Sequence, residues 1–246
     1  TFSDKANGYV RGEGAGMLML KGLKAAQRDG DAIYAVIKGA AENHGGRTTS
    51  LTARNPNAQA DVIKRAVEDA GIDFSRVGYI ECHGTGTELG DPVEIRGLKA
   101  VSKDLLDPVA AAEKRENHPC YLGSIKSNIG HLEYAAGVMG LIKVIQQIRH
   151  RKIARSLHCD QVSPLIDLNG TPCVIAQQAC EWVVPAGQTR IAGVSSFGFG
   201  GANAHVIVEE YVERESSSAS TDADTAQLLV FSARNVDSLY NTLQAY

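Results

Sequence analysis

Three glycine-containing loops hold the residues whose types are suited to chemistry. They are HGTGT at residues 83–87, KSNIGH at 126–131 and GFGG at 198–201. Each loop is predicted to connect a strand to the next element, and α/β folds collect their functional groups at such connections. The first two loops contribute one histidine each, and the second also contributes a lysine. These loops are therefore the candidate functional site.

Three kinds of enzyme site can be tested against the same residues. A dinucleotide site needs a helix after its glycine loop, but GFGG is followed by the predicted strand AHVIVEEY. A serine-hydrolase turn needs G-x-S-x-G, and GVSSF at 193–197 has phenylalanine where the second glycine belongs. His131 and Glu133 form the H-x-E pattern of zinc deaminases, but no P-C-x-x-C follows them. The sequence excludes all three.

Two helices and a strand are predicted around the first loop. The clearest helix spans residues 55–71, with Asn55 as N-cap, proline at the first helical position and glycine at the end. Its apolar face consists of Val62, Ile63, Ala66, Val67 and Ala70. A short strand at 77–82 then enters HGTGT.

The second helix is predicted to open directly after this loop. Asp91 is placed as its N-cap, Pro92 at the first position and Glu94 at the third, and it is expected to end near Leu105. The following segment, 107–119, is interpreted as a surface connection.

The remaining elements continue the alternation of strands and helices. A strand at 120–128 leads into KSNIGH, and a helix at 133–152 begins with two Ala/Gly-rich turns that allow a neighbouring backbone to come close. Further strands are predicted at 8–21, 32–46, 190–198 and 204–211. This alternation predicts an α/β fold of layered sheets.

Composition excludes several classes of partner. The chain of 246 residues is 43% hydrophobic and 22% charged, with a net charge of −3 and no long run of either sign. Neither nucleic-acid binding nor membrane binding is expected. Five cysteines without a C-x-x-C pair fit neither a disulfide framework nor a zinc site, so no metal and a cytoplasmic location are predicted.

The C-terminal region changes in character. Residues 212–226 form a polar, serine-rich linker that has too little apolar surface to order itself. Residues 227–246 are predicted to contain a strand and a helix, the start of a flanking segment after the main domain at 1–211.

Six motifs together carry a family resemblance over residues 1–211. They are GYVRGEGAG, ENHGG, NPNAQ, HGTGTELGDPVE, GSIKSNIGHLEYAAG and GVSSFGFGGANAHVIVEE. In order and spacing they resemble the C-terminal half of a β-ketoacyl synthase, or ketosynthase, of a modular type I polyketide synthase. The resemblance implies a thiolase-like layered fold. It also implies decarboxylative Claisen condensation of an acyl chain with malonyl-acyl carrier protein.

The resemblance assigns roles to three residues of the first two loops. His83 and His131 match the two active-site histidines, which would donate N–H bonds from neutral rings to the thioester oxygen. His131 is expected at the start of a helix, whose positive end disfavours the imidazolium form. Lys126 matches the catalytic-site lysine, with Glu133 as its predicted charge partner and Glu94 as the alternative.

Other positions match binding and gating residues of the family. Thr85 and Thr87 match hydroxyls that hold phosphopantetheine, which the acyl carrier protein carries and this chain does not bind by itself. Phe199, between Gly198 and Gly200, matches the residue of a second oxyanion hole that also gates the acyl pocket.

The sequence lacks the cysteine nucleophile in its usual context. Cys82 adjoins His83, but it ends a strand and is predicted to point away from the pocket. An N-terminal half that carries the nucleophile is therefore an expected partner, and the complete domain is expected to be a homodimer. A non-elongating acyl-transfer or docking module is the alternative. The histidines at 44 and 205 are interpreted as structural, and Arg54 stands where the family commonly has proline.

Overall fold

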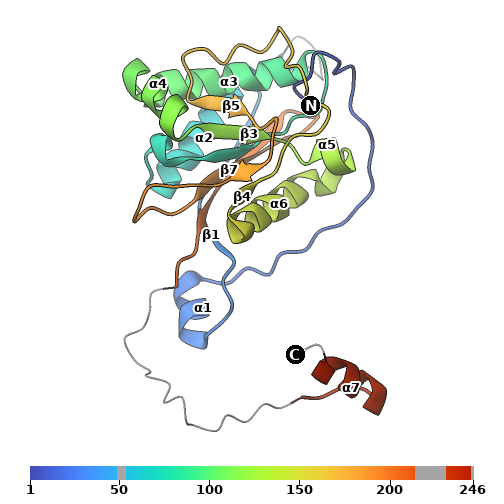
Figure 1. The fold of residues 1–246 in the computed structure, drawn as a ribbon. Helices are drawn as coiled ribbons and strands as arrows, with labels where there is room; N and C mark the ends of the chain where they lie inside the picture. Colours follow the sequence, from blue (N-terminus) through green and yellow to red (C-terminus); the bar gives the residue numbers. More distant parts are fainter. Residues whose placement is uncertain (49–53, 214–230, 245–246) are drawn as a thin grey trace. The chain divides into compact units, whose positions relative to one another are not determined.

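The computed structural model describes residues 1–48, 54–213 and 231–244. The chain divides into two compact units, Thr1–Val212 and Glu213–Tyr246. Within the described part of the first unit, six strands form one sheet in the order β1-β8-β7-β2-β3-β5 (Figure 1). Its strands are β1 (Ala35–His44), β2 (Tyr79–Glu81), β3 (Cys120–Gly123), β5 (Cys173–Ile175), β7 (Ile191–Phe197) and β8 (Ala202–Glu210).

A smaller sheet and several helices complete the first unit. The smaller sheet pairs β4 (Lys152–Ile153) with β6 (Cys180–Glu181). The α-helices are α1 (Leu23–Asp29), α2 (Pro56–Ala70), α3 (Gly90–Leu105), α4 (Pro108–Asn117), α5 (Lys126–Ile129) and α6 (Ala136–His150). Short 3₁₀ turns occur at Phe74–Arg76 and Glu133–Ala135. The described part of the second unit contains α7 (Val236–Gln244).

Strand direction brings the three candidate loops to one edge of the sheet. β7, β2, β3 and β5 are parallel to one another, whereas β8 and β1 run antiparallel to their neighbours. The loops at 83–87, 124–131 and 198–201 follow β2, β3 and β7, and the carboxyl ends of parallel neighbours lie together. The central position of β2 therefore sets the site between the other two loops.

Helices cover both faces of the sheet, which gives the layered α/β fold. α2 and α3 pack on one face (Figure 1). Ile63 and Leu98 of these helices share a hydrophobic core with Ile80 of β2. α6 packs on the other face, where Val144 contacts a second core that contains Tyr79. Successive residues of β2 thus enter opposite cores, as the pleat of a strand requires.

The predicted helix at 55–71 is confirmed in detail. α2 has Asn55 as N-cap, whose side chain accepts hydrogen bonds from the N–H groups of Asn57 and Ala58. Pro56 occupies the first turn, and Gly71 ends the helix in the left-handed conformation. These local signals needed no tertiary contact to be recognised.

The predicted cap of the next helix is wrong. α3 begins at Gly90, and Thr87 Oγ1 accepts the Gly90 N–H at 3.1 Å. Asp91 is instead buried and accepts the N–H groups of Phe2 at 2.8 Å and Gly86 at 3.0 Å. The Asp91 carboxylate therefore satisfies buried backbone N–H groups, one of them far away in sequence, and does not cap α3 as the sequence pattern predicted.

Two further predictions differ from the structure, and a third lies largely outside the described residues. Residues 8–21 do not form a strand, and Met17 and Met19 of this segment are almost fully exposed. The predicted connection at 107–119 contains α4, which Asp107 caps. The predicted strand at 227–233 lies largely outside the described residues, whereas the helix expected after it is present as α7.

Close packing of β1 on α2 gives a test of the fold. A Cβ added at Gly39 would lie 2.4 Å from the backbone nitrogen of Ala70 and 2.6 Å from the backbone oxygen of Ala66. Gly39→Ala should therefore lower the free energy of unfolding by about 1–3 kcal/mol, measured by urea denaturation. Gly22→Ala, where a Cβ meets nothing within 4 Å, is the control and should change it less. Equal effects of the two substitutions would contradict the packing.

Candidate active site

The rings of His83 and His131 meet at the carboxyl edge of the sheet. Their centroids are 5.5 Å apart with an interplanar angle of 83°, so one ring presents its edge to the other. His83 is buried and also contacts the Phe197 ring, whereas His131 is partly exposed and contacts Tyr9. The structure thus brings together the two histidines that the loop sequences singled out.

Backbone hydrogen bonds hold His83 and orient its ring. The N–H groups of His83 and Gly84 each donate to a carboxylate oxygen of Glu94 on α3, both at 2.8 Å. The Phe197 N–H at the end of β7 donates to His83 Nδ1 at 3.3 Å. Because Nδ1 accepts this bond, a neutral ring carries its proton on Nε2. His83 therefore presents an Nε2–H donor.

His131 is held in a similar way. Its Nδ1 accepts the N–H of Glu133 at 3.0 Å, so its neutral ring also carries the proton on Nε2. Its backbone pairs with the N-terminal segment: the His131 N–H donates to Val10 O at 2.7 Å, and the Gly12 N–H donates to His131 O at 3.0 Å. Both rings consequently present the same type of donor atom.

Burial keeps both imidazoles neutral. Burial lowers the pKa of His83 well below 6.5, and the nearby Lys126 and Arg54 charges lower it further. Burial also lowers the pKa of His131, again with help from Lys126. The predicted role of a helix start is wrong, because α6 begins at Ala136 and a 3₁₀ turn separates it from His131. The direction of the shift agrees with the prediction, but its cause is burial.

Lys126 opens the helical turn α5 beside the histidines. Burial lowers its pKa, and the carboxylates of Glu81 and Glu94 oppose that shift. The predicted partner Glu133 instead forms an ion pair with Arg11 at 3.7 Å, and among the described residues no ion pair joins Glu133 to Lys126. Glu133 follows His131 by two residues, and its carboxylate lies near Arg11 of the N-terminal segment.

Glu94 and Arg54 complete the charges around His83. The Glu94 carboxylate is fully buried, and burial raises its pKa to about 6 although two backbone N–H groups stabilise the charged form. Burial lowers the pKa of the Arg54 guanidinium, and the carboxylates of Glu94 and Asp91 oppose that shift. In the sequence, Arg54 stands out only as a departure from the family pattern. Its position near the histidines depends on the tertiary fold and could not be predicted.

Thr85 and Thr87 contact each other in the loop before α3. Their hydroxyl oxygens are 3.1 Å apart, and Thr87 Oγ1 also accepts the N–H of Gly90, the first residue of α3. Thr85 lines a pocket of about 910 Å³ together with Lys126 and His131, and residues of the N-terminal segment form its other wall. The loops are tied to each other here, because Ser124 Oγ donates to Gly84 O at 3.2 Å.

The GFGG turn directly follows Phe197 and so lies next to this site. Its own contacts, however, are with His44 and Gly45 at the end of β1. The Phe199 side chain is 71% exposed, and among the described residues no ring contact joins it to His83 or His131. His44 Nε2 lies 2.9 Å from Gly200 O, and the Gly45 N–H donates to Gly201 O at 2.7 Å. These contacts fit the structural role predicted for His44 from the sequence, and its strand β1 pairs with β8, the strand that follows GFGG.

Two other predictions about single residues can be compared with the structure. Cys82 lies in the core that α2 and α3 cover, and burial raises its thiol pKa well above 9.0. It therefore points away from the histidines, as alternation along the strand predicted. His205 is buried, contacts Ser195 Oγ at 3.0 Å, and burial lowers its pKa to about 3, which fits a structural role.

The described residues contain neither a group of side chains that could bind a metal ion nor a helix that could span a membrane. No group of three or more His, Cys, Asp or Glu side chains among them could hold a metal ion. Within the same residues, no helix has the length and apolarity that crossing a bilayer requires.

Comparison with protein families identifies the chain. Residues 34–160 match the family described as beta-ketoacyl synthase, C-terminal domain, and residues 164–246 match the ketoacyl-synthetase C-terminal extension. Residues 1–26 match the beta-ketoacyl synthase N-terminal domain. The chain belongs to the β-ketoacyl synthase family and corresponds to the C-terminal portion of a polyketide synthase ketosynthase domain.

Individual relatives agree with this assignment. Polyketide synthase PksN of Bacillus subtilis strain 168 is 54% identical over 248 residues, which cover 97% of this chain and 4% of PksN. The ketosynthase from module 6 of the B. subtilis 168 bacillaene synthase has a TM-score of 0.80 at 38% identity. The match covers 86% of this chain and 36% of that ketosynthase chain. The oxazolomycin ketosynthase OzmH KS7 of Streptomyces albus JA3453 has a TM-score of 0.83 at 38% identity, covering 99% and 41%.

The structural relatives confirm the thiolase-like α/β fold. The chain nevertheless spans less than half of each solved ketosynthase chain and a small fraction of PksN.

The protonation state of His83 can be measured directly. Because burial lowers its pKa and the Phe197 N–H occupies Nδ1, His83 should remain neutral with the proton on Nε2 at pH values where an ordinary histidine, with a pKa of about 6.5, becomes protonated. Long-range ¹H–¹⁵N spectra of histidine-labelled protein, assigned with a His83→Gln variant, report both properties. An imidazolium pattern near pH 6, or a proton on Nδ1, would contradict the site geometry.

Proposed function

We propose that this chain supplies the C-terminal half of a ketosynthase that catalyses decarboxylative Claisen condensation of an acyl chain with malonyl-acyl carrier protein. The observation that carries the proposal is the pair of neutral imidazoles, both with Nδ1 occupied by a backbone N–H. Two Nε2–H donors on neighbouring rings are suited to an oxygen on which negative charge develops.

The proposed reaction begins on the malonyl thioester. The bond to its carboxylate breaks, carbon dioxide leaves, and the bonding electrons form an enolate whose charge rests on the thioester oxygen. Hydrogen bonds from His83 and His131 stabilise that oxygen by about 3–4 kcal/mol for each donor. The enolate carbon then attacks the acyl thioester carbonyl on a cysteine of the N-terminal half, and the cysteine thiolate leaves.

Lys126 supports this chemistry without attacking the substrate. Its positive charge lowers the pKa of both histidines, so it helps to keep them as neutral donors. The same charge lies beside the pocket where the malonyl carboxylate would enter. We assign it the task of organising the histidines and local water.

Binding and gating roles follow for the remaining residues. Thr85 and Thr87 hold the phosphopantetheine arm of the acyl carrier protein, which is a partner and not a resident cofactor of this chain. Phe199, between Gly198 and Gly200, supplies a second oxyanion donor and gates the acyl pocket. The complete enzyme is a homodimeric acyltransferase of the cytoplasm, and its N-terminal half carries the nucleophilic cysteine.

A non-elongating acyl-transfer or docking module is the alternative function. Loss of an active-site histidine is the usual sequence sign of such a module in this family. Here both histidines are present and their rings lie next to each other, with centroids 5.5 Å apart, which favours condensation.

Release of carbon dioxide tests the proposal. A ketosynthase that joins this chain to its N-terminal half is incubated with malonyl-acyl carrier protein, and carbon dioxide and cysteine acylation are both measured. His83→Ala and His131→Ala should each reduce carbon dioxide release about 10²- to 10³-fold while acylation persists, because each removes one donor to the enolate.

The control variant is His150→Ala, since this histidine is exposed at the end of α6. It should retain the activity of the unmodified enzyme. If the unmodified enzyme accepts acyl groups but releases no carbon dioxide, the condensation role is wrong and the docking or transfer role replaces it.

A further inference from the structure

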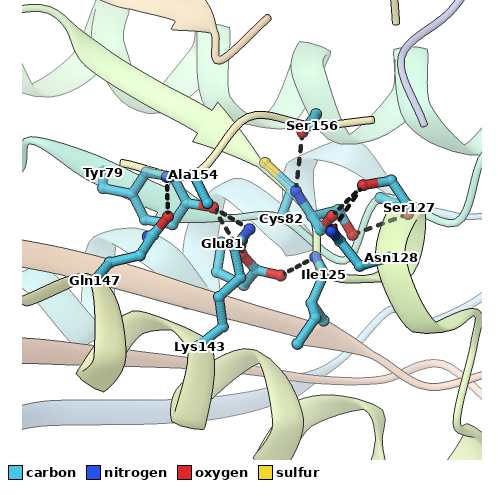
Figure 2. A network of polar contacts seen from close by, with 12 residues as sticks. Tyr79, Glu81, Cys82, Ile125, Ser127, Asn128, Lys143, Gln147, Ala154 and Ser156 are labelled. Carbon is cyan, nitrogen blue, oxygen red and sulfur yellow. Dashed lines mark hydrogen bonds and ion pairs between the residues drawn. The ribbon is translucent and has the colours of Figure 1, made fainter. Parts of the chain in front are cut away.

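A buried ion pair joins Lys143 to Glu81, which is two residues before His83 (Figure 2). Lys143 Nζ of α6 is 2.7 Å from Glu81 Oε2 at the end of β2, and the two side chains are only 10% and 2% exposed. The Tyr79 hydroxyl also donates to Glu81 Oε2 at 2.7 Å. Water screens the charge of such a deeply buried carboxylate only weakly. Glu81 can therefore act on neighbouring residues through its charge as well as through its hydrogen bonds.

The second oxygen of Glu81 reaches the neighbouring loop. Glu81 Oε1 accepts the backbone N–H of Ile125, the residue before Lys126 (Figure 2). Glu81 is also two residues before His83 on the same strand. One carboxylate therefore connects β2, α6 and the peptide that leads into Lys126.

Local sequence explains how this contact is built. Tyr79 and Glu81 alternate with Ile80 along β2 and so face α6. Gly140 lies one turn before Lys143 on α6, and a Cβ there would be 3.1 Å from Glu81 Cγ. The small residue in the Ala/Gly-rich part of this helix leaves room for the carboxylate.

Glu81 is also the acidic group with the largest effect on Lys126. Burial lowers the pKa of Lys126, and Glu81 opposes this more than Glu94 does. Arg54 acts in the opposite direction to these two carboxylates. The ionisable groups that influence Lys126, or that it influences, are Glu81, Glu94, Arg54, Cys82, His83 and His131.

We propose that Glu81 is a positioning residue for the condensation, which fixes the Ile125–Lys126 peptide and supplies the negative charge that stabilises the Lys126 ammonium group. This inference rests on the proposed function. It adds a residue to the site that the loop motifs do not contain. The simpler possibility is that Glu81 only neutralises buried Lys143.

Two variants separate these roles. Glu81→Gln removes the charge but leaves Lys143 buried without a counter-ion, which is destabilising by itself. The double variant Glu81→Gln/Lys143→Met removes both charges at similar volume and so relieves the unpaired cation. Unfolding measurements establish that the double variant is folded, and it carries the test if the single variant is not.

The readouts are carbon dioxide release from malonyl-acyl carrier protein and cysteine acylation, in the ketosynthase that contains the N-terminal half. In the double variant, carbon dioxide release should fall about 10- to 100-fold while acylation changes less than about twofold, because misplacing one loop affects only decarboxylation. The alkaline limb of its pH profile should move to lower pH, since Lys126 loses the carboxylate that favours its protonated form.

The matched control is Glu181→Gln/Lys152→Met, which removes an exposed pair 3.4 Å apart with side chains 66% and 65% exposed. This control should keep the rate and pH profile of the unmodified enzyme. If Glu81→Gln/Lys143→Met also keeps both, Glu81 only neutralises Lys143 and the inference is overturned. Absence of carbon dioxide release from the unmodified enzyme would instead overturn the proposed function.

Discussion

Two backbone N–H groups determine which ring nitrogen each histidine of the candidate active site can use as a hydrogen-bond donor. The amides of Phe197 and Glu133 occupy Nδ1 of His83 and His131, and this leaves Nε2–H as the donor on each neutral ring. Burial keeps the rings uncharged, with Lys126 nearby acting in the same direction. If either amide pointed elsewhere, the ring could turn or change tautomer, and its Nε2–H donor would no longer be fixed.

The sheet makes this arrangement possible because β2 lies between β7 and β3, parallel to both. Each of the three strands ends in a loop at the same edge, so groups far apart in sequence become neighbours. Beneath that edge, Glu81 connects β2 to α6 and to the loop after β3. The site is therefore supported by a buried polar network, and the loops do not hold it alone.

Features that depend on neighbouring residues were predictable from the sequence, and those that depend on distant partners were not. The cap of α2 and the strands β7 and β8 follow from local pattern, and His83 and His131 follow from their loops. The environment of Asp91 was missed because its partners Phe2 and Gly86 meet it only in the folded chain. For the same reason the sequence predicted Glu133, with Glu94 as the alternative, as the charge partner of Lys126, and did not indicate Glu81.

The central claim is that both imidazoles donate to a single developing oxyanion. A crystal structure of the complete ketosynthase with a malonyl thioester analogue that cannot lose carbon dioxide tests it most directly. The account predicts the thioester oxygen at about 2.7–3.1 Å from Nε2 of both His83 and His131. An analogue oxygen that contacts only one of the rings, or that approaches Nδ1, would contradict it.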